Sequence, residues 1–156
     1  MGIAPTLQEY LNDHGVEYEV VAHELTHTSS QTALASHVPQ ERLAKAVVLA
    51  REGGIVVAVL PASCKVRLDV VEQHFRCPIT MASEAEISSL FPDCEVGAVP
   101  PIGAAYAVDC IVDESLEQEA DIYLEGGDHR SLIRVSHAQF HDLMKDVPHA
   151  RIGTYE

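Results

Sequence analysis

Residues 97–103, with the sequence G-A-V-P-P-I-G, form the stretch of this chain best suited to holding a ligand oxygen. Gly97 and Gly103 can adopt positive φ, and Val99 precedes a proline and so avoids the helical region. Pro100 and Pro101 fix φ at about −65° and carry no N–H. A rigid loop of this kind can direct backbone N–H groups at an oxyanion, a carboxylate or a phosphate. The same residues also suit a tight turn between elements, so the loop needs partners elsewhere in the chain.

Lys45 is the second candidate, because it lies near the start of the apolar run L-A-K-A-V-V-L-A. An ammonium group within such a strand has to be desolvated or paired, and lysines in this situation are often functional. The alternative is a lysine at a strand edge whose ammonium reaches water. Lys45 alone does not decide between these two interpretations.

Residues 23–27 read H-E-L-T-H, which matches the H-E-x-x-H motif of zinc hydrolases. That motif works on a helix, where residues i and i+4 share one face. Here the segment follows an expected strand and precedes Thr and Ser residues, and in extended chain His23 and His27 would lie roughly 13 Å apart. We therefore expect no metal and no other cofactor, with a zinc hydrolase as the alternative to test.

The remaining candidates are a histidine and the cysteines. His129 follows a Gly-Gly turn and could line a pocket or relay a proton, or could be an ordinary loop histidine. The four cysteines lie 13, 17 and 16 residues apart, which fits neither a zinc site nor a disulfide framework. Cys64 and Cys94 have no histidine fixed near them by sequence, so we interpret all four as structural thiols.

Composition narrows the class of protein. The 156 residues suit one domain, and no repeat, linker or low-complexity segment divides residues 1–156. The formal charge of −14 argues against non-specific binding to DNA or RNA. Six of the ten basic residues nevertheless fall within residues 42–76, which is compatible with contacting the end of a structured RNA.

The N-terminal sequence has no basic or apolar region typical of a signal peptide, so we expect a cytoplasmic protein. The longest apolar run, residues 55–62, has eight residues and is too short to cross a membrane. We therefore expect no membrane partner.

Hydrophobic periodicity, caps and turn residues predict the elements. Expected helices cover residues 7–14, 31–35, 66–75, 83–91 and 136–147, with capping boxes at Thr6/Glu9, Ser83/Glu86 and Ser136/Gln139 and a cap at Ser29 or Ser30. Expected strands cover residues 17–22, 44–50, 55–60, 105–112, 121–124 and 132–135, with a short one after Pro78. These elements do not alternate strictly, so we expect an α+β domain with a mixed, largely antiparallel sheet.

Three features in this order and spacing resemble the YbaK and prolyl-tRNA synthetase editing-domain family, the aminoacyl-tRNA deacylases. They are Lys45 in its apolar strand, the loop at residues 97–103, and the E-G-G turn at residues 125–127 that leads into L-I-R-V-S at residues 132–136. The resemblance covers nearly the whole chain. It implies one YbaK-like editing domain with a barrel-like sheet and helices packed around it.

The resemblance also implies a free-standing enzyme that hydrolyses the ester of a small mischarged amino acid on tRNA, with tRNA-Pro as the expected tRNA. The family's lysine falls on Lys45, and its G-x-x-P loop begins at Gly97. Lys45 would supply charge, and the N–H groups of Gly97 and Ala98 would stabilise the oxyanion while water attacks. Further substrate-binding residues would be Val99, Pro100, Pro101, Gly103, Gly127 and His129.

Two positions depart from the family pattern. The residue after the lysine, often polar in relatives, is Ala46, and Leu132 stands where some members carry an aspartate. These departures leave open which amino acid is removed. The alternative function is a non-catalytic member of the same fold that binds tRNA or an aminoacyl-tRNA synthetase, and a synthetase could also supply the tRNA affinity that an acidic enzyme lacks.

Overall fold

The computed structural model describes residues 3–26, 28–95 and 97–155, and its centre is the hairpin of β2 (Leu43–Arg51) and β3 (Gly54–Pro61). The two strands pair antiparallel from Ala44↔Pro61 to Arg51↔Gly54. Both are rich in valine, whose branched side chain suits a buried strand, and Gly53 supplies the positive φ of the turn at 80°. The predicted hairpin is confirmed.

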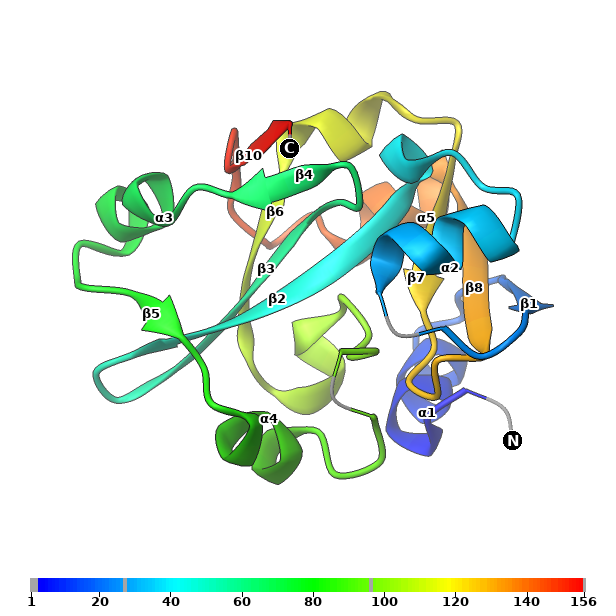
Figure 1. Cartoon of the computed structure of the whole chain (residues 1–156), viewed down its shortest axis with the longest axis horizontal. Helices are drawn as coiled ribbons and strands as arrows, with labels where there is room; N and C mark the ends of the chain where they lie inside the picture. Colours follow the sequence, from blue (N-terminus) through cyan, green and yellow to red (C-terminus); the bar gives the residue numbers. More distant parts are fainter. Residues whose placement is uncertain (1–2, 27, 96, 156) are drawn as a thin grey trace.

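The described strands form an eight-stranded mixed sheet in the order β1-β8-β7-β2-β3-β6-β9, with β5 paired to β2 (Figure 1). The β2–β7, β3–β6 and β6–β9 pairs are parallel, and the other pairs of this sheet are antiparallel. A separate ladder joins β4 to β10. The remaining bounds are β1 Glu19–Ala22, β4 Cys64–Val66, β5 Thr80–Met81, β6 Asp109–Asp113, β7 Asp121–Glu125, β8 Ser131–Ser136, β9 His149–Ala150 and β10 Gly153–Tyr155.

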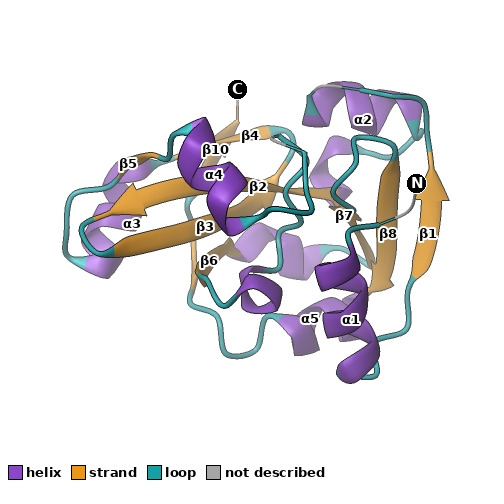
Figure 2. Ribbon diagram, turned by 90° about the horizontal axis from the view of Figure 1, so that it is seen from below, coloured by secondary structure: helices purple, strands orange, loops and turns teal. Residues whose placement is uncertain are grey.

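Helices cover both faces of the β7–β8 part of the sheet, with α2 on one face and α1 and α5 on the other (Figure 2). The α-helices are α1 Pro5–Asp13, α2 Ser29–Ala35, α3 Leu68–Phe75, α4 Glu84–Leu90 and α5 His137–Leu143. The short 3₁₀ helices of the described residues are η1 Gln40–Arg42, η2 Gly103–Tyr106 and η3 Glu114–Gln118. The predicted α+β class with a mixed, largely antiparallel sheet is confirmed.

The two faces of β2 bury different apolar groups. Ala44 and Val48 join the largest core cluster, together with Val99 and Ile102 of the loop after α4. Leu43 faces the other way and packs with Ala33 in the cluster beneath α2. Side chains alternate along a strand, so Lys45 projects on the same face as Leu43.

Several predicted helix ends are wrong. The Thr6/Glu9 capping box does not form, because α1 begins at Pro5 and the Thr6 N–H instead donates to Asp93 Oδ2 at 2.8 Å. The cap of α2 is Thr28, whose side chain accepts from the Gln31 N–H, rather than Ser29 or Ser30.

The predicted helix over residues 66–75 starts late, because residues 64–66 form β4. At the predicted strand 105–112, residues 103–106 are helical and the strand covers Asp109–Asp113. The closing helix ends at Leu143 rather than Val147. The Ser83/Glu86 capping box is confirmed, and Ser136 caps α5 by accepting from the Gln139 N–H.

Within residues 3–26, 28–95 and 97–155, no helix is long and apolar enough to span a membrane.

Candidate functional site

The turn between β7 and β8, residues 126–130, carries two of the predicted site residues. Gly127 has φ 114° and His129 has φ 61°. The Asp128 carboxylate supports this backbone by accepting from the Arg130 N–H at 2.9 Å and from Ser131 Oγ at 3.2 Å. A Cβ on Gly127 would lie 3.0 Å from the Ala4 Cβ, so both the positive φ and the close approach of the N-terminal segment require glycine.

The loop at residues 97–103 is anchored in the core at its apolar positions. Ala98, Val99 and Ile102 are buried, and Pro100 and Pro101 are buried with them. Gly103 closes the loop, and its N–H donates to Cys110 Sγ at 3.2 Å. Gly97 is the exposed residue of the loop, with φ 91°.

The two predicted oxyanion donors differ in their surroundings. The Ala98 N–H donates to the Glu95 carbonyl at 3.1 Å, so a ligand at this N–H would have to replace that bond. Gly97, by contrast, lies at the surface in a conformation that glycine adopts easily. The geometry therefore favours the Gly97 end of the loop for contact with a ligand.

The loop and the β7–β8 turn lie side by side. The Glu95 N–H donates to the Gly127 carbonyl at 2.7 Å, and a Cβ on Gly127 would lie 3.3 Å from Cys94 Sγ. Residues 92–95 line a pocket of about 490 Å³ together with Gly127, Asp128 and residues 3–5. The segment that leads into the 97–103 loop therefore packs against the β7–β8 turn.

Lys45 lies beside the end of β7 that leads into this turn. The parallel ladder of β2 and β7 pairs Ala44 with Leu124, so Lys45 and Glu125 are the next residues on the two strands. Lys45 is partly exposed, and its side chain is on the face covered by α2. The buried side chains of Val99 and Ile102 pack on the opposite face of β2.

The sheet is open beside Lys45. On the edge away from β3, β2 pairs with β7 at residues 43–44 and with β5 at residues 49–50. Within the described part of the chain, no strand pairs with residues 45–48 on that edge. In Figures 1 and 2 the segment after α4 runs between the β2–β3–β6 half of the sheet and the β7–β8–β1 half.

Glu125 is a chemically distinctive residue that sequence reasoning missed. It is 2% exposed, and its Oε2 atom is buried with no hydrogen-bond partner among the described residues. The pKa of Glu125 is raised to about 7: burial is the main cause, the Thr32 hydroxyl opposes it, and the Asp128 charge adds to it. An E-G-G sequence normally indicates a solvated turn, so nothing local signals a buried carboxyl group.

The H-E-x-x-H segment does not have the conformation of a zinc hydrolase. Residues 23–26 are irregular and not helical, and His27 lies outside the described residues. The N–H groups of His23 and Thr26 donate to the carbonyls of Arg130 and His129. This segment therefore flanks the β7–β8 turn, and the helical basis of the motif is missing.

The cysteines have the surroundings of structural thiols. All four are free, and burial raises the pKa of Cys94 to about 12 and that of Cys110 to about 11. Thiols with such pKa values remain protonated near neutral pH, and a protonated thiol is a poor nucleophile.

Comparison with known proteins agrees with this arrangement. The model of the aminoacyl-tRNA editing domain family matches residues 23–143. A solved structure proposed to be a trans-editing enzyme for prolyl tRNA synthetase superposes with a TM-score of 0.85 at 22% identity, covering 97% of this chain and 96% of the other.

Two further solved structures share the fold. A hypothetical protein has a TM-score of 0.85 at 19% identity, covering 96% of this chain and 99% of the other. A structure from a study of epitope grafting onto scaffold proteins has a TM-score of 0.86 at 22% identity and covers 97% of each chain. A search of curated proteins gives no match. Since the family model spans most of the sequence, this chain belongs to the aminoacyl-tRNA editing domain family.

Proposed function

We propose that this protein is a free-standing deacylase that hydrolyses the ester bond between a small mischarged amino acid and tRNA. The observation that carries the proposal is the Glu95–Gly127 hydrogen bond, which holds the segment before the Gly97 loop against the β7–β8 turn, with Lys45 on β2 beside the end of β7 that leads into this turn. Family membership supplies the reaction class.

In the proposed mechanism, Lys45 binds the carbonyl end of the substrate and the terminal ribose through its ammonium group. The Gly97 N–H donates to the oxygen that becomes negative as water attacks the ester carbonyl. The C–O bond to the ribose then breaks, the ribose oxygen takes a proton, and the free amino acid and tRNA leave. Positioning and oxyanion stabilisation can suffice because an ester is a reactive substrate.

His129 is the proposed proton relay or pocket residue. It is 9% exposed and adopts a left-handed backbone conformation with φ 61°. Non-glycine residues with positive φ are uncommon, and such backbone strain concentrates at functional sites.

For the substrate, we infer a mischarged tRNA-Pro. The support is the fold shared with the protein proposed to be a trans-editing enzyme for prolyl tRNA synthetase. A synthetase partner would compensate for the net charge of −14, which opposes tRNA binding by this chain alone. The free thiols suit the reducing cytoplasm, where charged tRNA is used.

The test is a deacylation assay over a panel of mischarged tRNAs with wild type, Lys45→Ala and Lys45→Arg. We expect Lys45→Ala to lower kcat/KM by roughly 100- to 1,000-fold, because its ammonium group holds the carbonyl end of the substrate, where negative charge develops. Lys145→Ala is the matched control, because Lys145 pairs with Asp142 on the surface near the end of α5.

The assay tests the role of Lys45 separately from the deacylase activity itself. Unchanged hydrolysis by Lys45→Ala would refute the proposed role of the lysine. Hydrolysis of no aminoacyl-tRNA by the wild type, together with measurable tRNA or synthetase binding, would instead favour the non-catalytic binding function.

A further inference from the structure

The positive charge of this chain is concentrated in one segment. Residues 42–76 carry six of the ten Lys and Arg residues and only three of the 24 Asp and Glu residues, which gives this segment a formal charge of +3. The other four basic and 21 acidic residues give the rest of the chain a formal charge of −17. A local basic surface on an acidic protein can attract a polyanion that the net charge would repel.

Part of this segment forms the outer face of β4. Cys64 and Val66 pack inward, against the apolar cluster that also holds Leu49 of β2. The chain remains extended through Arg67, with φ −95° and ψ 97°. Because side chains alternate along an extended chain, Lys65 and Arg67 project outward, and both are exposed.

Arg76 adds a third cation at the other end of α3. Arg67 precedes the first residue of α3, and Arg76 follows its last residue with φ 58°. A helix of eight residues is about 12 Å long, so the two arginines bracket a span of roughly that length. Val71 is buried between them, whereas Arg76 is exposed. We call Lys65, Arg67 and Arg76 the α3 basic surface.

Little negative charge neutralises the α3 basic surface. Arg67 pairs with Asp69 at 3.3 Å, but both side chains are exposed, and an exposed ion pair contributes little. Glu72 of the same helix accepts a backbone N–H through Oε2 at 2.9 Å. No carboxylate of the described residues pairs with Lys65 or Arg76. These two cations therefore remain available to an external anion.

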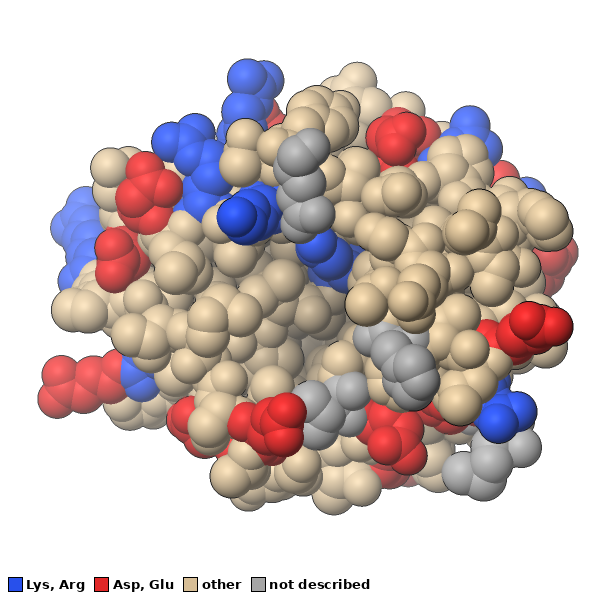
Figure 3. Space-filling model, viewed as in Figure 1, with Lys and Arg blue, Asp and Glu red and all other residues tan. Residues whose placement is uncertain are grey.

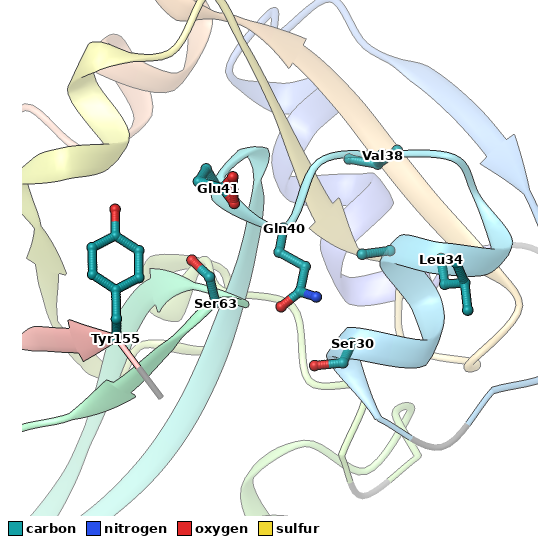
Figure 4. A pocket seen from close by; sticks show the side chains of 8 residues that line it. Ser30, Leu34, Val38, Gln40, Glu41, Ser63 and Tyr155 are labelled. Atoms are coloured by element: carbon teal, nitrogen blue, oxygen red, sulfur yellow. The ribbon is translucent and has the colours of Figure 1, made fainter.

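The basic side chains stand on the outside of the molecule and not in the neighbouring groove. Figure 3 shows Lys and Arg side chains gathered over α3, β4 and β10. The groove of about 630 Å³ between α2 and the β4–β10 ladder has no Lys or Arg among its described lining residues, and Glu41 lies in it (Figure 4). A phosphate would be repelled in this groove, so the outer side of β4 and α3 is the surface that suits a polyanion.

The α3 basic surface is on the same side of the central sheet as Lys45. Val47 and Leu49 share a face of β2 with Lys45, and they pack in the cluster that holds Cys64 and Val71. β4 and α3 therefore cover the β2 face that carries Lys45, and their basic side chains point to the solvent on that side.

We propose that the α3 basic surface binds the phosphate backbone of the double-helical stem of an RNA. This inference rests on the proposed function and adds to it a contact surface outside the reaction site. Phosphate contacts made by Lys and Arg position a nucleic acid without reading its sequence, and they make its affinity depend on salt. The protein should therefore bind RNA stems of different sequence with similar, strongly salt-dependent affinity.

The test measures binding of the full chain to two RNAs by fluorescence anisotropy. One is a short stem-loop that ends in single-stranded CCA, and the other is the single-stranded end alone. The variant is Lys65→Gln/Arg76→Gln. Each phosphate contact to a duplex contributes about 0.9 to the slope of log affinity against log salt, so the slope for the stem-loop should fall by about 2. Between about 50 and 200 mM salt, the variant should lose roughly 10-fold less affinity than the wild type.

The matched control is Arg134→Gln/Lys145→Gln, which removes the same two residue types from another part of the chain. Arg134 pairs with Asp121, and Lys145 pairs with Asp142. The control should keep the salt slope of the wild type. The proposal would be overturned by equal slopes for Lys65→Gln/Arg76→Gln and the wild type, by the same loss of slope in the control, or by a wild type that binds the stem-loop no more tightly than the single strand.

A deacylation assay separates this surface from the proposed activity. Lys65→Gln/Arg76→Gln should raise KM for aminoacyl-tRNA with little change in kcat. Salt-dependent binding of the stem-loop without hydrolysis of any aminoacyl-tRNA would support the surface and reject the deacylase. Hydrolysis with an unchanged KM and an unchanged salt slope would reject the surface and leave the deacylase intact.

Discussion

Replacing Glu125 with glutamine should change how the stability of this protein depends on pH. The carboxyl group is 2% exposed, and burial raises its pKa from 4.5 to about 7. Because the folded pKa exceeds the unfolded value, the folded state binds more protons between these two pH values. The free energy of unfolding of the wild type should therefore fall as pH rises through this window.

The size of this change in the free energy of unfolding follows from the pKa shift of Glu125. A difference of one pKa unit corresponds to about 1.4 kcal/mol, and the raised pKa lies some two to three units above the ordinary value. Between pH 5 and pH 8 the free energy of unfolding of the wild type should fall by roughly 2 to 3 kcal/mol because Glu125 loses its proton. Glutamine keeps the shape and the polar contact but does not titrate, so the variant should lose none of this contribution.

The assay is urea denaturation of wild type and Glu125→Gln at pH 5 and pH 8. We expect the free energy of unfolding of the variant, relative to that of the wild type, to increase by roughly 2 to 3 kcal/mol between pH 5 and pH 8. Glu52→Gln is the matched control, because it makes the same chemical change in the exposed β2–β3 turn. A stability difference between variant and wild type that does not change with pH would refute the reasoning.

Two further predictions concern packing and capping. Gly103→Ala should destabilise the fold by about 1 to 3 kcal/mol, because the new Cβ would lie 2.5 Å from Cys110 Sγ. The measurement is the same urea titration. Gly54→Ala is the control, because its Cβ would meet no atom closer than 3.9 Å. Asp93→Ala should cost about 1 kcal/mol at pH 7, because Asp93 accepts the Thr6 N–H at the start of α1. Burial raises the pKa of Asp93, but its hydrogen bonds together outweigh burial and leave the pKa below its ordinary value. The contribution of Asp93 to stability is therefore present above the unfolded pKa and lost as pH falls through the folded pKa. Thermal unfolding of wild type and variant at pH 7 and pH 3 should show the stability difference shrinking at pH 3, and a constant difference would contradict this role.

The parts of the fold that sequence predicted best depend on local patterns. The β2–β3 hairpin follows from two valine-rich runs around a Gly-Gly turn, and the α4 cap follows from the Ser83/Glu86 spacing. Both patterns involve residues a few positions apart, so the chain signals them without reference to the rest of the molecule. The order of Lys45, the Gly97 loop and the Gly126–Gly127 turn was likewise sufficient to identify the family.

Contacts between distant segments were not predictable in this way. The cap of α1 comes from Asp93, 87 residues after Thr6, and β4 exists because residues 153–155 pair with it. The Ala98 N–H, one of two expected oxyanion donors, already donates to the Glu95 carbonyl. Each of these depends on how the folded chain brings remote groups together, which residue type and spacing do not encode.

The sequence by itself determined the class of the fold, the central hairpin, the family and the candidate residues, because periodicity, turn chemistry and motif order are local properties. Only the tertiary structure placed the segment before the Gly97 loop against the Gly127 turn and buried the Glu125 carboxyl group. Burial and proximity arise from packing the whole chain, and they decide which of the candidate groups can act on a ligand.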